Sequence, residues 1–571
     1  MEKIRPFLAS ALAAALVCGG AEASSVLLDA MEAELARAME TMGSSTDVPL
    51  YYMQYTVTDE SRFELSAADG GFNAPESSRL RYLDVDIRVG SMSLDNTHEI
   101  RGGGSSDNYP PRRVVQFPIQ DEPGSARATL WAETEYQYHK AVDRYSKVVT
   151  NRQIKVEEAD KSADFSPMPP HQYAEVVVPT RRDTSLIRPI MRRAAKYFTE
   201  HSFVLNSGVS FTILDKTTYL VSSEGHRLQF GNRYLRMDLT VVGMANDGME
   251  LSRHEGFSAA VPEHLPDETT VMKTAERLVK ELRLLIDAPE VEPYLGPAIL
   301  RSRASGVFFH EIFGHRVEGH RQKRTDEGQT FTKKIGESIL PPFISVYDDP
   351  TVFRHGKHDL RGYYAFDDEG TPAQRVTIVE RGVLKGFLMS RSPIDGFPLS
   401  NGHGRRQYGY DVVSRQGNLI VESSETVPWE ELRRRLIAEC ERQGKPYGLV
   451  FEDIGGGFTT TARRGPQAFK VLPLLVTRVY TDGRPDEIVR GVDIVGTPLT
   501  SFNKIICTGD DYDVFNGTCG AESGMVPASC ISPSILVSEI EVEKRQKAQE
   551  KPPILPPPRC DAGGAAVGTH G

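Results

Sequence analysis

The segment that most constrains this chain runs from Gly306 to His320, where three imidazoles and two carboxylates fall within eleven residues behind an apolar stretch. Within it, His310, Glu311 and His315 form an H-E-x-x-x-H pattern. A metal ion held by imidazoles strongly lowers the pKa of a bound water, and a neighbouring carboxylate can take the water's proton during attack on a carbonyl. The segment therefore predicts a metallopeptidase centre, with His310 and His315 as ligands and Glu311 as the base.

The spacing of the two histidines places a condition on the local backbone. In the H-E-x-x-H pattern the histidines lie about 40° apart around the helix axis, so both rings reach one ion. Here the second histidine is at i+5, about 140° away on a regular helix, which is too far. A π-bulge would rewind the turn, and Gly314 is the position where the helix can yield. We therefore expect an irregular helix between His310 and His315.

A purely structural interpretation of the same segment is also possible. The apolar residues would form a buried helix and the histidines would be hydrogen-bonded passengers on it; these apolar residues are Phe308, Phe309, Ile312 and Phe313. The density of histidine and glutamate favours the metal site instead. His320 and Glu318 follow closely, and either could fill a fourth ligand position if the metal were structural.

A catalytic zinc site needs a third protein ligand and one position left open. The candidate is Cys519, which lies on a polar, glycine-bracketed stretch from Asn516 to Met525 where the backbone can pass close to an ion. A thiolate with two imidazoles suits Zn²⁺. Considered alone, Cys519 would more often be a structural cysteine.

Taken together, the two segments resemble the TldD/PmbA family of metallopeptidases, and the likeness spans most of residues 125–543. The ordered matches are Leu130-Trp131, Gly296-Pro297, Asp367 to Pro372, Gly382 to Leu388, Asn401 to Arg406, Gly455 to Gly457, Val489 to Gly491 and the stretch around Cys519. The chain keeps the metal motif, so it resembles the active TldD type rather than the PmbA type. It departs from the family pattern at His320, where some members have an acidic residue.

The resemblance implies one zinc ion per chain, bound by His310, His315 and Cys519, with Glu311 as catalyst. Members of the family look like proteases of unfolded or flexible peptides. Some work as a paired assembly with a related metal-free chain, so the resemblance implies a homodimer or such a heterodimer.

Residues 1–23 have the features of a signal peptide. Lys3 and Arg5 precede an apolar core from Phe7 to Val17, and a small-x-small cleavage site ends at Ala23. The apolar core is too short to span a bilayer, and no later stretch is apolar enough to do so. We therefore expect a periplasmic or secreted protein, although the family is usually thought of as cytosolic.

Export bears on the cysteines. Removing the signal peptide leaves five cysteines, an odd number that implies at least one thiol free, metal-bound or paired between chains. With Cys519 as a ligand, Cys507 and Cys530 are one possible disulfide. The net charge of −11 and the pI near 5.8 argue against general nucleic-acid binding.

The chain divides into four parts, and its fold class is predicted as α+β. After the signal peptide, residues 24–290 alternate helical and strand patterns, which predicts an N-terminal α/β domain. A proline-rich boundary precedes residues 291–545, where short strands and Gly-rich turns predict a mainly antiparallel β sandwich or barrel carrying the metal-site helix. Residues 546–571 are rich in Pro, Gly and Ala and are expected to be disordered.

Three further residues are candidates for substrate binding. Arg405 and Arg406 lie in a Gly-rich loop and could bind a substrate carboxylate or steady an oxyanion, unless they form a solvated basic turn. Gly456, within the run 455–457, could let a peptide backbone approach a strand edge, unless the run is a β-bulge or a tight turn.

The sequence thus predicts an exported zinc peptidase of unfolded or flexible polypeptides. Two alternatives stay open: a non-catalytic binding or assembly partner with a structural metal, and an amidase acting on modified peptides.

Overall fold

The computed structural model describes residues 25–43, 48–103, 105–110, 112–153, 160–463, 468–496 and 501–545. The predicted signal peptide and the predicted disordered tail lie outside these residues. In the described part of the chain, no helix combines the length and hydrophobicity that crossing a bilayer requires.

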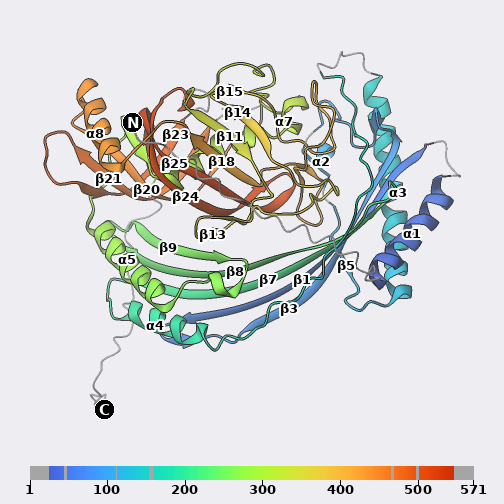
Figure 1. Cartoon of the computed structure of the whole chain (residues 1–571), viewed down its shortest axis with the longest axis horizontal. Helices are drawn as coiled ribbons and strands as arrows, with labels where there is room; N and C mark the ends of the chain where they lie inside the picture. The colour runs from blue at the N-terminus through green and yellow to red at the C-terminus, as the bar shows by residue number, and fades with distance from the viewer. Residues whose placement is uncertain are drawn as a thin grey trace, which may run out of the picture.

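The N-terminal half is built on a curved nine-stranded sheet, which sweeps across the molecule in Figure 1. Its order is β4-β3-β1-β7-β8-β6, with β9 on β8, and its pairs are antiparallel except β6 with β8. Burial alternates along β8 because successive side chains point to opposite faces. The strands are β1 (Leu50–Ala68), β2 (Gly71–Phe72), β3 (Glu76–Ser91), β4 (Leu94–Asp95), β5 (Val115–Phe117), β6 (Gln172–Ala174), β7 (Asn206–Ser222), β8 (Arg227–Met244) and β9 (Glu250–Ala259).

Four longer helices pack against this sheet in two pairs at its two ends (Figure 1). They are α1 (Val26–Gly43) with α3 (Pro123–Arg152), and α4 (Ile187–Thr199) with α5 (Glu268–Asp287). Asp267 caps α5, its side chain accepting a hydrogen bond from the Thr270 amide at 2.8 Å. Two short elements, α2 (Ser105–Asn108) and the 3₁₀ turn η1 (Pro262–His264), complete this half.

The C-terminal half contains a mixed twelve-stranded sheet whose long central strand is β25 (Gly524–Lys544). The order is β10-β20-β21-β23-β25-β18-β11-β14-β15, and β24 forms a hairpin with β25. The other strands are β10 (Tyr294–Leu300), β11 (Ile344–Asp348), β14 (Val376–Glu380), β15 (Val383–Leu384), β18 (Asn418–Ser423), β19 (Thr426–Val427), β20 (Tyr447–Thr459), β21 (Phe469–Tyr480), β22 (Glu487–Val489), β23 (Val492–Gly496) and β24 (Ile505–Ala521). Two small ribbons pair β12 (Arg354–His355) with β13 (His358–Asp359) and β16 (Gly404–Arg405) with β17 (Val413–Ser414).

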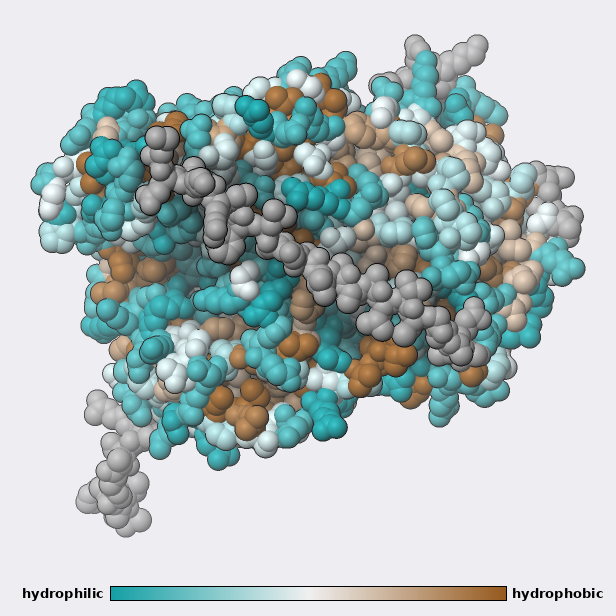
Figure 2. All heavy atoms as spheres, viewed as in Figure 1, coloured by the Kyte–Doolittle hydropathy of each residue, from teal (hydrophilic) through white to brown (hydrophobic). Residues whose placement is uncertain are grey.

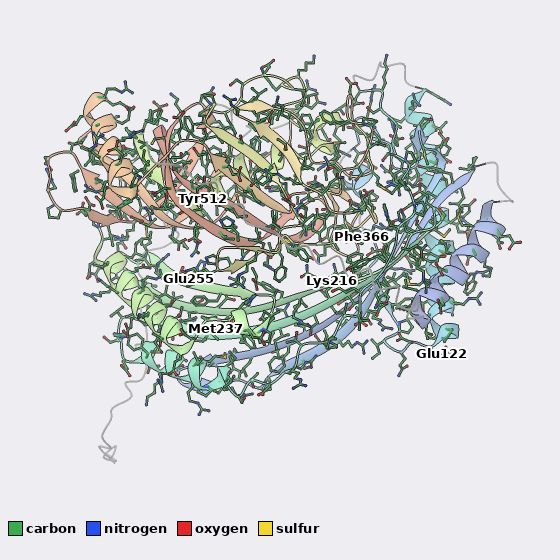
Figure 3. The ribbon with its side chains drawn as sticks, in the orientation of Figure 1. Glu122, Lys216, Met237, Glu255, Phe366 and Tyr512 are labelled. Atoms are coloured by element: carbon green, nitrogen blue, oxygen red, sulfur yellow. The ribbon has the colours of Figure 1, made fainter. Side chains whose placement is uncertain are left out.

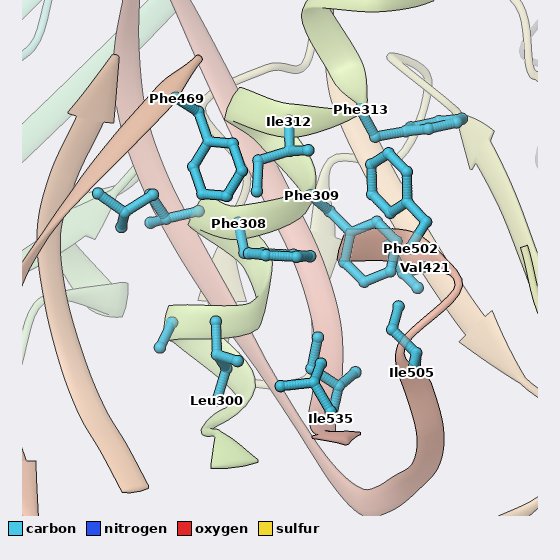
Figure 4. Close-up of a cluster of buried hydrophobic side chains, with 14 of the residues drawn as sticks. Leu300, Phe308, Phe309, Ile312, Phe313, Val421, Phe469, Phe502, Ile505 and Ile535 are labelled. Carbon is cyan, nitrogen blue, oxygen red and sulfur yellow. The ribbon is translucent and has the colours of Figure 1, made fainter. Parts of the chain in front are cut away.

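Helix α6 (Ser302–Ile312) lies in the largest apolar core of this half. Its phenylalanines contact aromatic rings from β21 and from the segment before β24: the centroid of Phe308 is 6.0 Å from that of Phe469, and the centroid of Phe309 is 6.2 Å from that of Phe502 (Figure 4). A second helix, α8 (Trp429–Arg442), packs with its own apolar cluster. The segment α7 (His320–Lys323) follows the metal-site region. The face seen in Figure 2 is mostly hydrophilic, with scattered apolar patches.

The α+β class predicted from the sequence is confirmed, and the predicted boundary near residue 290 falls between α5 and β10. The possible disulfide between Cys507 and Cys530 is wrong, because both are free, buried thiols. In the β24–β25 hairpin Cys507 lies opposite Leu536 and Cys530 lies opposite Phe515, so the register keeps the two sulfurs at separate positions.

Candidate metal centre and cleft

The helix carrying the H-E-x-x-x-H pattern stops between its two histidines. α6 ends at Ile312, and a 3₁₀ turn, η2 (Gly314–Arg316), follows. The predicted irregularity is confirmed, but the chain leaves the helix instead of forming a π-bulge. Gly314 permits this path: a Cβ there would lie 1.9 Å from Oε1 of Gln416. The guanidinium of Arg316 donates to the freed carbonyl of Ile312 at 2.9 Å and so caps the helix end.

This backbone break, together with the long hairpin, brings the three predicted ligands together. One ligand atom from each of His310, His315 and Cys519 lies within 4.8 Å of the other two, and all three residues are buried. Sγ of Cys519 is 3.2 Å from Nε2 of His315, and the two imidazole centroids are 5.2 Å apart. The thiol arrives on β24, whose partner strand β25 packs on α6.

Buried charged groups support this cluster of three candidate ligands. Oε2 of Glu318 lies 3.2 Å from Nδ1 of His315, which leaves the Nε2 atom directed at the thiol. Glu318 also pairs with Arg321 at 2.8 Å and with Arg415 at 3.4 Å, and its side chain is fully buried. Arg415 in turn donates to the carbonyl oxygen of Cys519 at 2.8 Å. A carboxylate behind a ligating histidine is the usual support of a metal site, since it fixes the ring and its tautomer.

The electrostatics of the cluster favour a thiolate. Burial raises the pKa of the Cys519 thiol, but the neighbouring His315 and His310 more than reverse this and hold its pKa well below the usual value. Burial likewise opposes protonation of His315, yet the Cys519 and Glu318 charges bring the His315 pKa well above 6.5. The pKa of Glu318 is lowered to about 2, because His315 and Arg321 outweigh its burial. A soft thiolate and two imidazoles are therefore already assembled, which is a donor set that fits zinc.

The cluster opens into a cleft of about 1430 Å³ between the two halves of the molecule. Its walls come from β9, the start of α5, the metal segment, β20 and β24. Figure 3 shows Glu255 of β9 on the side of the first sheet that faces the C-terminal half. Glu311 is half-buried and lines this cleft beside the histidines. Gly457 of β20 makes room for it: a Cβ at that position would lie 2.9 Å from Cγ of Glu311.

The three predicted substrate-binding residues lie in different surroundings. Gly456 lines the cleft. Arg405 and Arg406 do not line it, so the prediction that they contact a substrate there is wrong. Arg405 donates to the carbonyl of Pro527 at 2.6 Å, and Arg406 pairs with Asp86 at 2.8 Å, so both buried cations hold the protein together. Their Gly-rich surroundings suggested an exposed turn, but the loop packs against the first sheet.

His320 belongs to a neighbouring polar cluster. Its Nε2 atom is hydrogen-bonded to Oε1 of Glu522, and the other oxygen of Glu522 accepts a bond from Arg321 at 2.8 Å. Glu522 and Arg415 were not singled out from the sequence. A lone arginine carries no spacing signal, and Glu522 is informative only once β24 is known to run past the metal segment.

Comparison with known proteins identifies the class. Residues 294–544 match the family model for the PmbA/TldA metallopeptidase C-terminal domain. The chain is 26% identical over 272 residues to "Metalloprotease TldD homolog" of Haemophilus influenzae, which covers 47% of this chain and 52% of that protein. It is 25% identical over 269 residues to "Zinc metalloprotease TldD homolog" of Saccharolobus solfataricus, which covers 47% of this chain and 55% of that protein. The matches thus span about half the length of these relatives.

The fold agrees with this class. The solved structure of TldE from Thermococcus kodakarensis superposes with a TM-score of 0.58 at 15% identity, over 90% of this chain and all of that one. Residues 294–544 thus match a PmbA/TldA metallopeptidase C-terminal domain, and the chain shares the fold of the solved TldE structure.

Proposed function

We propose that this protein is a zinc-dependent peptidase that hydrolyses unfolded or flexible polypeptides. The observation that carries the proposal is the convergence of His310 and His315 with Cys519, which lies about 200 residues further along the chain, beside Glu311 in one large cleft. The naming of relatives as metalloproteases, one of them a zinc metalloprotease, supports it.

The donor set assigns a role to each side chain. His310, His315 and Cys519 would hold the zinc, which supplies polarisation of a carbonyl group and a lowered pKa for a water molecule. Glu311 would accept the proton of the attacking water and deliver it to the leaving amine nitrogen. Glu318 would keep the His315 ring oriented throughout.

The neighbouring groups favour a catalytic over a structural metal. Among the described residues, the ligand group holds three side chains, not four. Glu318 is engaged by His315 and two arginines, and His320 by Glu522, so neither is free to close the site. A zinc with three protein ligands keeps a position for substrate.

The strand carrying the thiol supports an extended substrate. From Tyr512 to Ala521, β24 pairs with β25 along one edge, while its pairing with β19 is confined to Thr426–Val427. Residues Asp513 to Ala521 line the cleft. A strand edge beside the catalytic groups can hydrogen-bond a peptide backbone without regard to sequence, and a folded chain offers no such free backbone.

Two variants test the proposal. Cys519→Ser should lose about one zinc per chain, measured by metal analysis of the purified protein. Glu311→Gln should keep the metal and lose cleavage of unstructured peptides. A Glu311→Gln protein that cleaves such peptides at the wild-type rate would reject the role of Glu311.

Two expectations of the sequence remain proposals. We infer export from residues 1–23, which fractionation of cells making the full chain would test. We also propose that the protein acts as a homodimer or with a related metal-free chain, and sedimentation of the purified protein alone and with such a chain would separate the two.

A further inference from the structure

Arg361 lies in the wall of the cleft and contacts Thr518, the residue that precedes the proposed zinc ligand Cys519 on β24. Its Nη1 atom donates to Oγ1 of Thr518 at 2.6 Å and to the carbonyl oxygen of Gly517 at 3.3 Å. Its guanidinium stacks 4.0 Å above the ring of Tyr234, which comes from β8 of the first sheet. The cation is thus clamped between the two halves of the protein.

The backbone at this position is fixed as firmly as the side chain. The amide of Arg361 donates to Oγ of Ser529 at 2.8 Å and to Oδ1 of Asn516 at 3.1 Å, and the next amide, of Gly362, also reaches Ser529. Gly362 passes close to a neighbouring chain segment, since a Cβ there would lie 2.1 Å from the carbonyl oxygen of Gly417. Arg361 is therefore held in place before any ligand binds, which lowers the entropy cost of recognition.

Arg361 differs from four of the other five arginines that line the cleft, because among the described residues it has no acidic partner within ion-pair distance. Among the described residues, four cleft arginines have carboxylates within ion-pair distance: Arg236 with Asp238, Arg303 with Glu255, Arg321 with Glu522, and Arg354 with Asp359. No carboxylate of the described residues forms an ion pair with Arg361. Burial lowers the pKa of its guanidinium, and the nearby Tyr234 and Asp238, which raise it, offset this effect only in part.

The unused donors of Arg361 have the geometry of a carboxylate site. Nη1 is occupied by Thr518 and Gly517, whereas Nε and Nη2 have no hydrogen-bond partner among the described residues and are not buried from solvent. These two atoms form the side-on fork that binds both oxygens of a carboxylate. We propose that Arg361 binds a carboxylate of the peptide substrate, so that the protein prefers acidic or C-terminal segments over neutral ones.

The position of Arg361 also limits where that carboxylate lies in the substrate. Thr518 precedes Cys519 directly, and consecutive Cα atoms are about 3.8 Å apart. An extended peptide advances about 3.3 Å per residue. The recognised carboxylate therefore belongs within roughly three residues of the cleaved bond, as an Asp or Glu side chain or as the chain terminus.

Because this inference rests on the proposed peptidase function, its test needs a binding measurement besides activity. The probes are unstructured peptides that share one neutral sequence. The reference peptide is amidated at its C-terminus. A second form has a free C-terminal carboxylate, and a third form is amidated and carries a single Glu at successive positions. Binding is measured by calorimetry on zinc-loaded Glu311→Gln protein, and kcat/KM on the wild type. We expect at least one carboxylate form to bind about tenfold to a hundredfold more tightly than the neutral amide. Comparison of the terminal and side-chain forms identifies the source of the carboxylate.

Three variants, made in the Glu311→Gln background for binding, complete the test. Arg361→Gln should abolish the preference, and Arg361→Lys, which keeps the charge but not the fork, should retain only a small part of it. Lys357→Gln is the matched control, because Lys357 is an exposed cation of the same cleft; it should keep the preference.

The inference is overturned if the wild type binds all forms equally, a result that does not depend on how well any variant folds. It is also overturned if Arg361→Gln lowers kcat for every peptide by one factor without changing the preference, since Arg361 would then stabilise the transition state. Normal zinc content and cleavage without a preference would reject this inference alone. Absence of cleavage in the wild type would reject the proposed function, and the binding comparison would still decide the role of Arg361.

Discussion

The carboxylate behind His315 gives the sharpest test of how the centre is held. Glu318→Gln keeps the size of the side chain and an oxygen that can accept the Nδ1–H of His315, but it removes the negative charge. Loss of such a supporting carboxylate typically costs tenfold to a hundredfold in metal affinity, or about 1.4 to 2.8 kcal/mol. We expect Glu318→Gln to show a drop in this range, because Glu318 is fully buried and no solvent screens its charge.

The same substitution should also destabilise the metal-free protein. Removing one partner of a buried ion pair costs about 3–5 kcal/mol, since the other charge is left uncompensated. Arg321 keeps Glu327 and Glu522 as partners, so the lower end of the range is expected. Arg415 loses its ion pair with Glu318 and retains hydrogen bonds to neutral oxygens.

Zinc affinity is measured by competition with a chromophoric chelator, and stability by denaturant unfolding of the chelated protein. Glu327→Gln is the matched control, because Glu327 pairs with Arg321 and has no contact with His315 among the described residues. Equal zinc affinities for the two variants would refute the argument that the Glu318 charge tunes the site.

The remaining predictions concern the cleft, the ligands and the fold. Gly457→Ala should lower peptide cleavage with unchanged zinc content, because its Cβ would displace Glu311; cleavage at the wild-type rate would show that the side chain has room to move. Zinc affinity should fall as pH decreases, beginning above pH 6.5, because the pKa values of His310 and His315 are raised in the metal-free site and protons compete with the metal; chelator competition across pH checks this. Asp267→Ala should cost about 1 kcal/mol by loss of the α5 cap, seen in denaturant unfolding. Chelation should leave the circular dichroism spectrum unchanged, because α6 is held by an apolar core; cooperative unfolding on chelation would contradict this.

Periodicity was a good guide to the helices. Leu27, Met31 and Leu35 recur at helical spacing along α1, and Leu432 and Leu436 do so along α8, because each pattern marks one buried face of its helix. The pairing of strands was not accessible in this way. β10 pairs with β25 across more than 200 residues, and neither strand's pattern specifies its partner.

The candidate site shows the same division between local and distant information. The break after Ile312 was predictable, since the i+5 spacing of the histidines is incompatible with a regular helix. The form of the break was not predictable, because it depends on Gln416, a residue about 100 positions further along the chain. Gln416 packs against Gly314, and its side-chain amide donates to the carbonyl oxygen of His310 at 3.4 Å.

The arginines show why residue type alone misassigned the substrate contacts. Arg405 and Arg406 stood out in a Gly-rich loop, yet buried acceptors neutralise or bind them. Arg361 carried no motif of its own, and its unused donors follow from the way three separate segments pack around it. A cation matters for recognition when its partners in the fold leave donors unused, and only the assembled structure reveals which partners those are.

Three glycines act in the same indirect way, because each gives space to a neighbour that the site needs. Gly314 makes room for Gln416, Gly362 for the chain beside Arg361, and Gly457 for Glu311. The reactive residues of this cleft are therefore positioned largely by residues with no reactivity of their own, and a substitution that only adds a methyl group can disable a site whose catalytic residues are all intact.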